Sequence, residues 1–339
     1  MRGRRSAVER MRGRVVVVTG ASAGVGRATA RRFARAGDAV ALLARGTDGL
    51  EAARNEVEKL GARALAIETD VADAHAVERA AERIEAELGP IDVWVNDAMV
   101  TVMSRIVDST AEDYRRVTEV TYLGAVHGSL AALRRMAPRG RGTIVQVGSA
   151  LAYRAIPLQS AYCAAKHAMR GFTDSLRTEL MHDGIGVHVT MVQLPALNTP
   201  QFEWSRLRFD RQPQPVPPIY APEVAAEAIF FAAGARRREV WVGGWNACLM
   251  FGNKIAPGIG DWYLARTGFA SQFTDEPVAP GRPDNLEAPL AGDWGASGRF
   301  GRRARRRSLQ LELTRRRRGL LLGAGAAFAA LCLGLRAKG

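Results

Sequence analysis

The 339-residue chain is predicted to fold as an α/β protein built on a doubly wound parallel sheet. Two observations predict this class. Short, continuously apolar runs alternate with segments of helix length over the first two thirds of the chain. Strands that helices cover on both faces have this composition. In addition, a glycine-rich turn follows the first apolar run and leads directly into a helical pattern.

The predicted strands follow in chain order. The first is a run of four valines at residues 15–18. The next five lie at residues 39–43, 62–68, 91–95, 143–147 and 186–192. Five prolines then interrupt the pattern between residues 200 and 218, which is typical of a lid over the binding site in this architecture. A helix at about 222–234 and a strand at 239–242 complete the predicted domain.

Composition divides the chain into four parts. A basic N-terminal extension at 1–11 precedes the predicted α/β domain at 12–250. An irregular extension rich in Pro, Gly and Asp is expected at 251–298, and a basic tail at 299–339. The net charge is +14, but residues 15–298 sum to −2 because the basic residues gather at the two ends. No nucleic-acid partner is expected, since the body has no basic face of its own.

The cysteine pattern and the first apolar run bear on location. Cys163, Cys248 and Cys332 lie far apart without metal-ligand spacing, so we expect reduced thiols, no disulfide framework and no metal site. The run at 15–18 is too short for a signal peptide. The α/β domain is therefore expected in the cytoplasm.

The glycine-rich turn is a candidate dinucleotide site. It reads Thr-Gly-Ala-Ser-Ala-Gly-Val-Gly at residues 19–26, between the first strand and the first helix. In this context glycines let the backbone approach a pyrophosphate at a helix N-terminus. The candidate contacts are Gly20, Ser22, Gly24, Val25 and Gly26. Their spacing resembles that of the single-domain branch of the short-chain dehydrogenase/reductase family, which has a Rossmann-type fold.

Residues after the second and third strands indicate which cofactor binds. A carboxylate that holds a ribose 2′-hydroxyl usually ends the second strand, but here Arg45 stands at that end. A guanidinium can bind a 2′-phosphate, which favours NADP over NAD; alternatively, Arg45 is a solvated surface charge. Asp70 and Val71 match the pair that contacts adenine in the family, although Asp70 is also explained as an ordinary strand-end residue.

Three residues form the candidate catalytic group. Tyr162 and Lys166 are four residues apart and so lie on one face of a helix, where the ammonium can stabilise a phenolate. Ser149 closes a buried strand thirteen residues before Tyr162. The resemblance covers residues 12–245. It implies hydride transfer between a nicotinamide and a carbonyl or alcohol carbon, with Tyr162 as general acid or base and Ser149 orienting the substrate oxygen. It also implies that Tyr162 and Lys166 contact the cofactor, Lys166 through the ribose hydroxyls.

Further site residues are implied by the same resemblance. Asn96 opens the family's Asn-Asn-Ala-Gly stretch, in which Asp97 and Met99 depart from the pattern here. Thr199 matches a threonine that binds the nicotinamide carboxamide, or it caps a helix. Thr121 stands where the family has an asparagine of the proton relay. Because a hydroxyl offers fewer hydrogen bonds than an amide, a catalytically weak cofactor-binding sensor or scaffold is the alternative function.

The tail contains an uncharged apolar run of 17 residues at 319–335, preceded by four arginines. Its length is at the short end of what crosses a bilayer. We expect it to anchor the enzyme to a membrane or lie in the membrane plane, which would favour a lipophilic substrate; packing in an oligomer, or disorder, is the alternative. A third function places the protein's main activity in this tail, as a membrane or nucleic-acid binder. The family resemblance implies a homo-oligomer.

Overall fold

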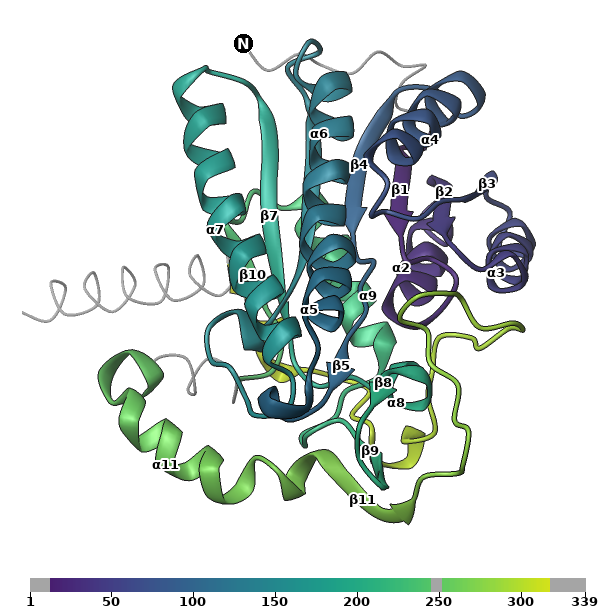
Figure 1. Cartoon of the computed structure of the whole chain (residues 1–339). Coiled ribbons are helices and arrows are strands. Elements are labelled where there is room, and N and C mark those ends of the chain that lie inside the picture. The colour runs from purple at the N-terminus through teal and green to yellow at the C-terminus, as the bar shows by residue number, and fades with distance from the viewer. Residues whose placement is uncertain (1–12, 245–251, 318–339) are drawn as a thin grey trace, which may run out of the picture.

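The computed structural model of the chain describes residues 13–244 and 252–317. A seven-stranded parallel sheet forms its centre, with helices against both faces (Figure 1). The strand order is β10-β7-β6-β4-β1-β2-β3. Apart from the seventh strand at one edge, this is the order of doubly wound dinucleotide-binding sheets. The predicted fold class is confirmed.

Each predicted strand is present, with ends shifted by at most three residues. The central strands are β1 (Val15–Thr19), β2 (Ala39–Ala44), β3 (Ala64–Glu68), β4 (Ile91–Asn96), β6 (Gly142–Ser149), β7 (Val187–Leu194) and β10 (Glu239–Trp241). In β1 the odd valines pack with the core on one face of the sheet and the even ones with the core on the other. Burial on both faces explains why the strands are continuously apolar.

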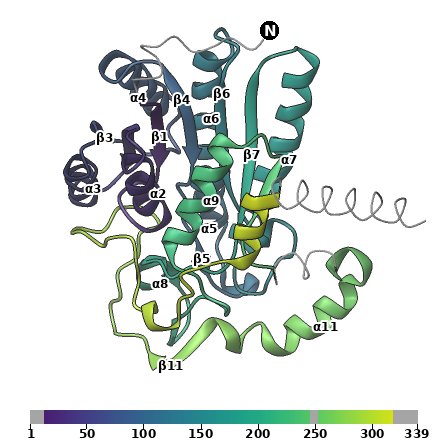
Figure 2. The ribbon, with the colours of Figure 1, turned by 180° about the vertical axis from the view of Figure 1, so that it is seen from behind.

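Two helical layers enclose the sheet. The helices α4 (Ala74–Glu87), α5 (Ala111–Thr118), α6 (Gly124–Met136) and α7 (Ser160–His182) lie on the face toward the viewer in Figure 1. The helices α2 (Gly24–Ala34), α3 (Thr47–Lys59) and α9 (Pro222–Gly234) cover the opposite face, as Figure 2 shows. Local signals start several of them: Asp73 accepts hydrogen bonds from two N–H groups of α4, and Pro222 occupies the first turn of α9.

The topology fixes where a ligand can bind. From β1 the chain builds one half of the sheet through β2 and β3, and it then crosses to β4 on the other side of β1. Ligands of such sheets bind outside the carboxyl ends of the strands at this switch point. The carboxyl ends of β1 and β4 therefore mark the candidate site.

Short elements surround that edge. The helix α8 (Gln201–Trp204) and the strands β8 (Arg206–Leu207) and β9 (Arg211–Pro213) belong to the proline-rich loop. The strand β5 (Val102–Met103) pairs with β8, so the loop is tied to the chain that follows β4.

The extension at 251–298 is more ordered than its composition indicates. It contains the helix α11 (Pro257–Thr267), with a proline in its first turn, and the strand β11 (Phe273–Pro277). The expectation of an irregular segment is wrong for this first part, because β11 pairs with β9, some sixty residues earlier in the chain. After β11 the chain has no regular element until the short helical turn η5 (Gly301–Arg303). In Figure 1 this part rises from the base of the molecule to α2 and α3.

The described part of the basic tail is packed against the domain. The N–H of Arg305 donates to the Ile219 carbonyl at 2.9 Å, and Leu311 is buried in the core beneath α9. The expected membrane segment at 319–335 lies outside the described residues. None of the helices in residues 13–244 and 252–317 is both long and apolar enough to cross a membrane.

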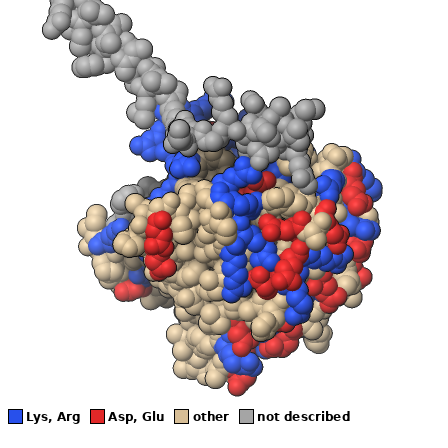
Figure 3. Space-filling model, turned by 90° about the horizontal axis from the view of Figure 1, so that it is seen from above, with Lys and Arg blue, Asp and Glu red and all other residues tan. Residues whose placement is uncertain are grey.

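Charge on the body is mixed. On the face shown in Figure 3, Lys and Arg side chains are interspersed with Asp and Glu. Several of these form ion pairs on helix surfaces, such as Arg83 with Glu87 and Arg134 with Glu78. This distribution agrees with the near-neutral sum that the sequence gives for residues 15–298.

Candidate active site

The turn after β1 requires its glycines. Gly20 has a φ of +71° and Gly24 a φ of +57°, both in the left-handed region. A Cβ at Gly26 would lie 2.3 Å from the Gly20 carbonyl oxygen, so only glycine lets α2 approach the turn this closely. The residue before α2, Ala23, provides no side-chain cap. The cap position therefore contributes no side chain that would compete with an anion for the first N–H groups of α2.

A cleft of about 190 Å³ lies beside this turn at the carboxyl edge of the sheet. Eight of the twelve predicted cofactor residues line it: Gly20, Ser22, Gly24, Val25, Arg45, Asp70, Val71 and Thr199. The other four, Gly26, Asn96, Tyr162 and Lys166, are not part of its lining. The eight follow the ends of β1, β2, β3 and β7. The fold thus brings together residues that are up to 179 positions apart in the sequence.

Asp70 is held as an ionised carboxylate. It forms an ion pair with Arg116 at 2.6 Å and accepts the Ala72 N–H at 3.0 Å. Burial alone would raise the pKa of Asp70, but these hydrogen bonds outweigh it and the pKa is lowered. Arg116 of α5, which sequence patterns do not single out, is therefore part of the support of this end of the cleft.

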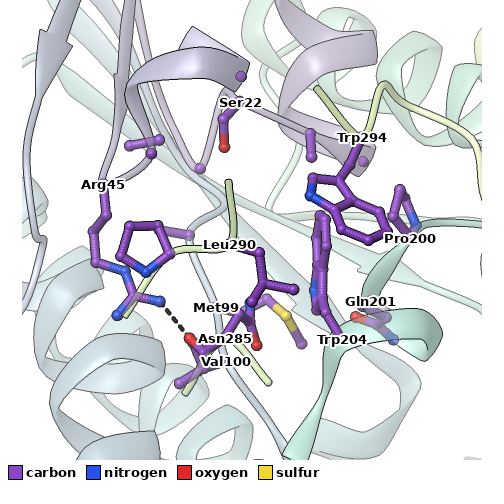
Figure 4. A pocket seen from close by; sticks show the side chains of 18 of the residues that line it. Ser22, Arg45, Met99, Val100, Pro200, Gln201, Trp204, Asn285, Leu290 and Trp294 are labelled. Carbon is purple, nitrogen blue, oxygen red and sulfur yellow. Dashed lines mark hydrogen bonds between the residues drawn. The ribbon is translucent and has the colours of Figure 1, made fainter. Parts of the chain in front are cut away.

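Arg45 faces the same end of the cleft, and its guanidinium binds carbonyl groups. It donates to the carbonyl oxygens of Asn285 at 2.5 Å and Glu287 at 2.8 Å (Figure 4). Within the described residues, no carboxylate forms an ion pair with Arg45 at 4.0 Å or less. Burial lowers the pKa of Arg45, with Asp70 opposing that shift at longer range. A desolvated cation without an anionic partner thus faces the cleft.

Asn96 has a different position from the expected one. Its Oδ1 accepts the Trp94 indole N–H at 2.9 Å, and its Nδ2 is within 3.2 Å of Gln146 Oε1, Ser129 Oγ and the Ala125 carbonyl oxygen. Asn96 is 3 % exposed and is not among the residues that line the cleft. The assignment as a cofactor contact is corrected on this ground: the side chain supports the end of β4. Gly26 likewise serves close packing and does not line the cleft.

The three candidate catalytic residues lie together. Ser149 ends β6, and Tyr162 and Lys166 are one turn apart on α7. The Lys166 Nζ lies 5.6 Å from the centroid of the Tyr162 ring and donates to the Val147 carbonyl at 2.7 Å. Burial raises the pKa of Tyr162, and the neighbouring Ser149 hydroxyl opposes that shift. Burial also lowers the pKa of Lys166.

Thr121 lies in a single π-helical turn, η2 (Glu119–Leu123), between α5 and α6. Its hydroxyl accepts the Val100 N–H at 3.1 Å and donates to the Val100 carbonyl at 3.0 Å. The turn packs against α7, which carries Tyr162 and Lys166. Single π turns inside α-helices occur frequently at functional sites.

Asp97 is a partly buried acid between the glycine-rich turn and Lys166. Its backbone N–H donates to Thr19 Oγ1 at 3.0 Å, and its carboxylate lies against Gly26, where an added Cβ would come within 3.0 Å of Oδ2. Burial raises the pKa of Asp97 well above its usual range, and the charge of Lys166 opposes that shift. Asp97 lines the cleft together with Ala98 and Met99, so the bulkier residue at Met99 forms part of its wall.

The sequence interpretation missed the outer wall of the cleft. It consists of Asn285, Pro289, Leu290, Gly292 and Trp294 from the extension, with Trp204 of α8 against Trp294. In Figure 4, Leu290 lies in the middle of the cleft between Arg45 and the two tryptophans. The one available signal was general: a long segment without secondary structure inside a compact domain is commonly functional.

Comparisons with known proteins agree with this geometry. The family model for short chain dehydrogenases matches residues 14–207. The uncharacterized oxidoreductase YxnA of Bacillus subtilis is 33% identical over 275 residues, which cover 80% of this chain and 77% of that protein. The human dehydrogenase/reductase SDR family member 7 is 36% identical over 170 residues, covering 49% of this chain and 50% of that protein.

A solved structure is similar over the same region. It is an alcohol dehydrogenase of the archaeon Thermococcus sibiricus in complex with 5-hydroxy-NADP. It superposes with a TM-score of 0.58 at 27% identity, and the match covers 68% of this chain and 95% of that one. With the family model matched over more than half of its length, this chain belongs to the short-chain dehydrogenase family and is an oxidoreductase of that family.

Proposed function

We propose that the protein is an NADP(H)-dependent oxidoreductase that interconverts a carbonyl compound and a secondary alcohol. The observation that carries this proposal is the placement of the Lys166 Nζ 5.6 Å from the centroid of the Tyr162 ring, one turn apart on α7, with the Ser149 hydroxyl near enough to lower the pKa of Tyr162. Two neighbouring hydroxyls can both bind the oxygen of a substrate placed between them.

Each residue has a role in this scheme. A nicotinamide held in the cleft would supply the hydride chemistry at the substrate carbon, and its oxidised ring would add positive charge near the phenol. During reduction, Tyr162 gives its hydroxyl proton to the substrate oxygen; during oxidation, the same oxygen takes that proton back. Ser149 donates to the substrate oxygen and stabilises its developing charge. Burial raises the pKa of Tyr162; the Lys166 ammonium would stabilise the phenolate that forms when Tyr162 gives up its proton.

The departure at Thr121 is compatible with catalysis. Its hydroxyl makes a pair of hydrogen bonds to Val100, which ties η2 to the chain after β4. We infer that Thr121 preserves the position of this turn beside α7 and that a water bound to its backbone can pass protons to Lys166. On this view the weaker hydrogen-bonding capacity of a hydroxyl has little effect on turnover.

The preference for NADP rests on charge at the end of β2. Arg45 is a partly buried cation without an ion-pair partner among the described residues, and Asp70 beside it is already paired with Arg116. A 2′-phosphate would supply the missing anion. The complex of the Thermococcus sibiricus relative with 5-hydroxy-NADP is consistent with this preference.

The test combines binding and turnover. We expect NADPH fluorescence to report tight binding, and a screen of ketones, aldehydes and secondary alcohols to reveal turnover that Tyr162→Phe reduces about 10²–10⁴-fold. Tyr220→Phe is the matched control, because Tyr220 is a buried tyrosine that packs in the core with Leu197 and Leu311. Binding without turnover, and without an effect of Tyr162→Phe, would favour the sensor or scaffold. Failure to bind either dinucleotide would refute both functions.

A further inference from the structure

We propose that residues 287–295, here called the strap, occupy the dinucleotide cleft and must swing out before a cofactor can bind. The inference rests on the proposed function, because it concerns how a dinucleotide reaches its site. Three sets of contacts carry it: one at the N-terminus of α2, one at Arg45 and one in the middle of the cleft.

At the N-terminus of α2, the strap uses a donor that a pyrophosphate would need. The N–H of Gly24, the first residue of α2, donates to the Gly295 carbonyl at 3.0 Å. This N–H is one of the helix-end donors that attract anions. Nearby, Asp293 accepts from Arg27 at 2.9 Å, and the Gly292 N–H binds the Asp48 carboxylate at 2.7 Å. The strap is therefore fastened over the glycine-rich turn.

At the other end, the strap engages the cation proposed to bind the 2′-phosphate. The Glu287 carbonyl accepts an Arg45 N–H at 2.8 Å. The carbonyl oxygens of Asn285 and Leu286, just before the strap, bind the same guanidinium at 2.5 and 3.3 Å. A phosphate that binds the Arg45 guanidinium would therefore have to displace the Glu287 carbonyl from it. The strap and a bound NADP would compete for donors at both ends of the cleft.

In the middle, the strap reduces the space available. Leu290 points into the cleft, and Trp294 packs edge-on against Trp204 with ring centroids 5.3 Å apart (Figure 4). The remaining volume is about 190 Å³. Sites for drug-sized ligands measure about 300–1,000 Å³, and a dinucleotide is larger than most such ligands. The cleft with the strap in place is too small for the whole cofactor.

The strap is built to move as a unit. Two buried residues flank it, Leu286 at 0% and Ala296 at 5% exposure. Between them the strap is exposed along most of its length, apart from Leu290 and Gly295, which are half-buried. Lifting it breaks the Arg27–Asp293 pair, but the buried Arg27 keeps its bond to Glu56 at 2.9 Å. Opening therefore leaves no buried charge without a partner at this point.

The experiment measures how fast NADPH binds to the full chain, by stopped-flow fluorescence. Asp293→Ala removes one fastening while leaving the residues that face the cofactor in place. Because Asp293 is half-exposed, we expect the apparent Kd to fall and the association rate to rise by roughly two- to fivefold. Leu290→Ala should raise affinity as well. Asp275→Ala, an exposed acid in β11 of the same extension, is the matched control and should leave both values unchanged.

A second measurement follows the strap itself. Amide hydrogen exchange of peptides covering residues 287–295 should increase when NADPH saturates the wild-type protein. Binding that is unchanged or weakened by Asp293→Ala, or strap amides that become protected by NADPH, would overturn the inference while the proposed function stands. Absence of dinucleotide binding in the wild type and in both strap variants would overturn the proposed function and, with it, the competition.

Discussion

The Thr121 hydroxyl binds both backbone polar groups of Val100, accepting the N–H at 3.1 Å and donating to the carbonyl at 3.0 Å. Both residues are buried, so water cannot replace these bonds at low cost. Thr121, which stands where the family has an asparagine, therefore links the π turn beside α7 to Val100 in the wall of the cleft.

This relationship predicts the behaviour of Thr121→Val. The valine has the same shape but leaves both Val100 groups unpaired, which should lower the free energy of unfolding by about 1–3 kcal/mol. We expect turnover to fall as well, because η2 loses its tie to the cleft. Urea unfolding and steady-state kinetics measure the two effects. Thr121→Ser, which keeps the hydroxyl, should remain near wild type in both; equal losses in the two variants would contradict this explanation.

Removing Arg45 should change cofactor preference. A hydrogen-bonded charge is worth about 1.5–3 kcal/mol, so Arg45→Ala should weaken NADPH binding roughly 10–150-fold relative to NADH. The readout is the ratio of the two Kd values, because loosening the strap affects both dinucleotides alike. Arg83→Ala, an exposed arginine on α4 distant from the cleft, should leave the ratio unchanged. An unaltered ratio in Arg45→Ala would show that the residue only anchors the chain at 285–287.

The partly buried acid Asp97 predicts a pH dependence of stability. Burial raises the pKa of Asp97 in the folded protein, so the folded state binds this proton more tightly than the unfolded chain does. The free energy of unfolding should therefore fall as pH rises from the ordinary aspartate pKa of about 3.9 toward neutrality. Asp97→Asn removes this slope, so the variant should gain stability over wild type across that window. Chemical unfolding at several pH values checks it; a constant difference would contradict the shift.

Asn96 should prove structural. Asn96→Ala leaves the Trp94 indole N–H without its acceptor and opens the network with Ser129 and Gln146. We expect a loss of about 1–3 kcal/mol in the free energy of unfolding, with the NADPH Kd of the folded variant unchanged. Asn55→Ala, at an exposed position of α3, is the control. A weaker cofactor affinity at unchanged stability would restore the original assignment.

Much of the fold, and the proximity of Tyr162 to Lys166, could be predicted because their signals are local. The seven strands are marked by short apolar runs, and Tyr162 and Lys166 are brought together by a single helical turn. The misplacement of Asn96 was avoidable. Side chains alternate along a strand, so Asn96 lies on the same face of β4 as the buried Trp94 and points toward α6.

The outer wall of the cleft could not be predicted in the same way. Arg45 is bound by three backbone carbonyls more than 200 residues later in the chain, and any residue types could supply those carbonyls. The antiparallel pairing of β11 with β9 is likewise a contact between backbones, and no residue pattern in either segment marks it. Contacts of this kind leave little trace in composition, which is why the extension could only be read as irregular from its sequence.

The ion pair between Arg27 and Asp293 joins positions 266 residues apart. A ribosome therefore makes the whole sheet and every residue of the glycine-rich turn before it makes the strap. At 5–20 residues per second, the roughly 50 residues between the end of the sheet and Asp293 take about 3–10 s to synthesise. During that interval the emerging chain has no strap, so if the strap blocks the cleft as we propose, translation would provide an open period in which a first cofactor molecule could be loaded.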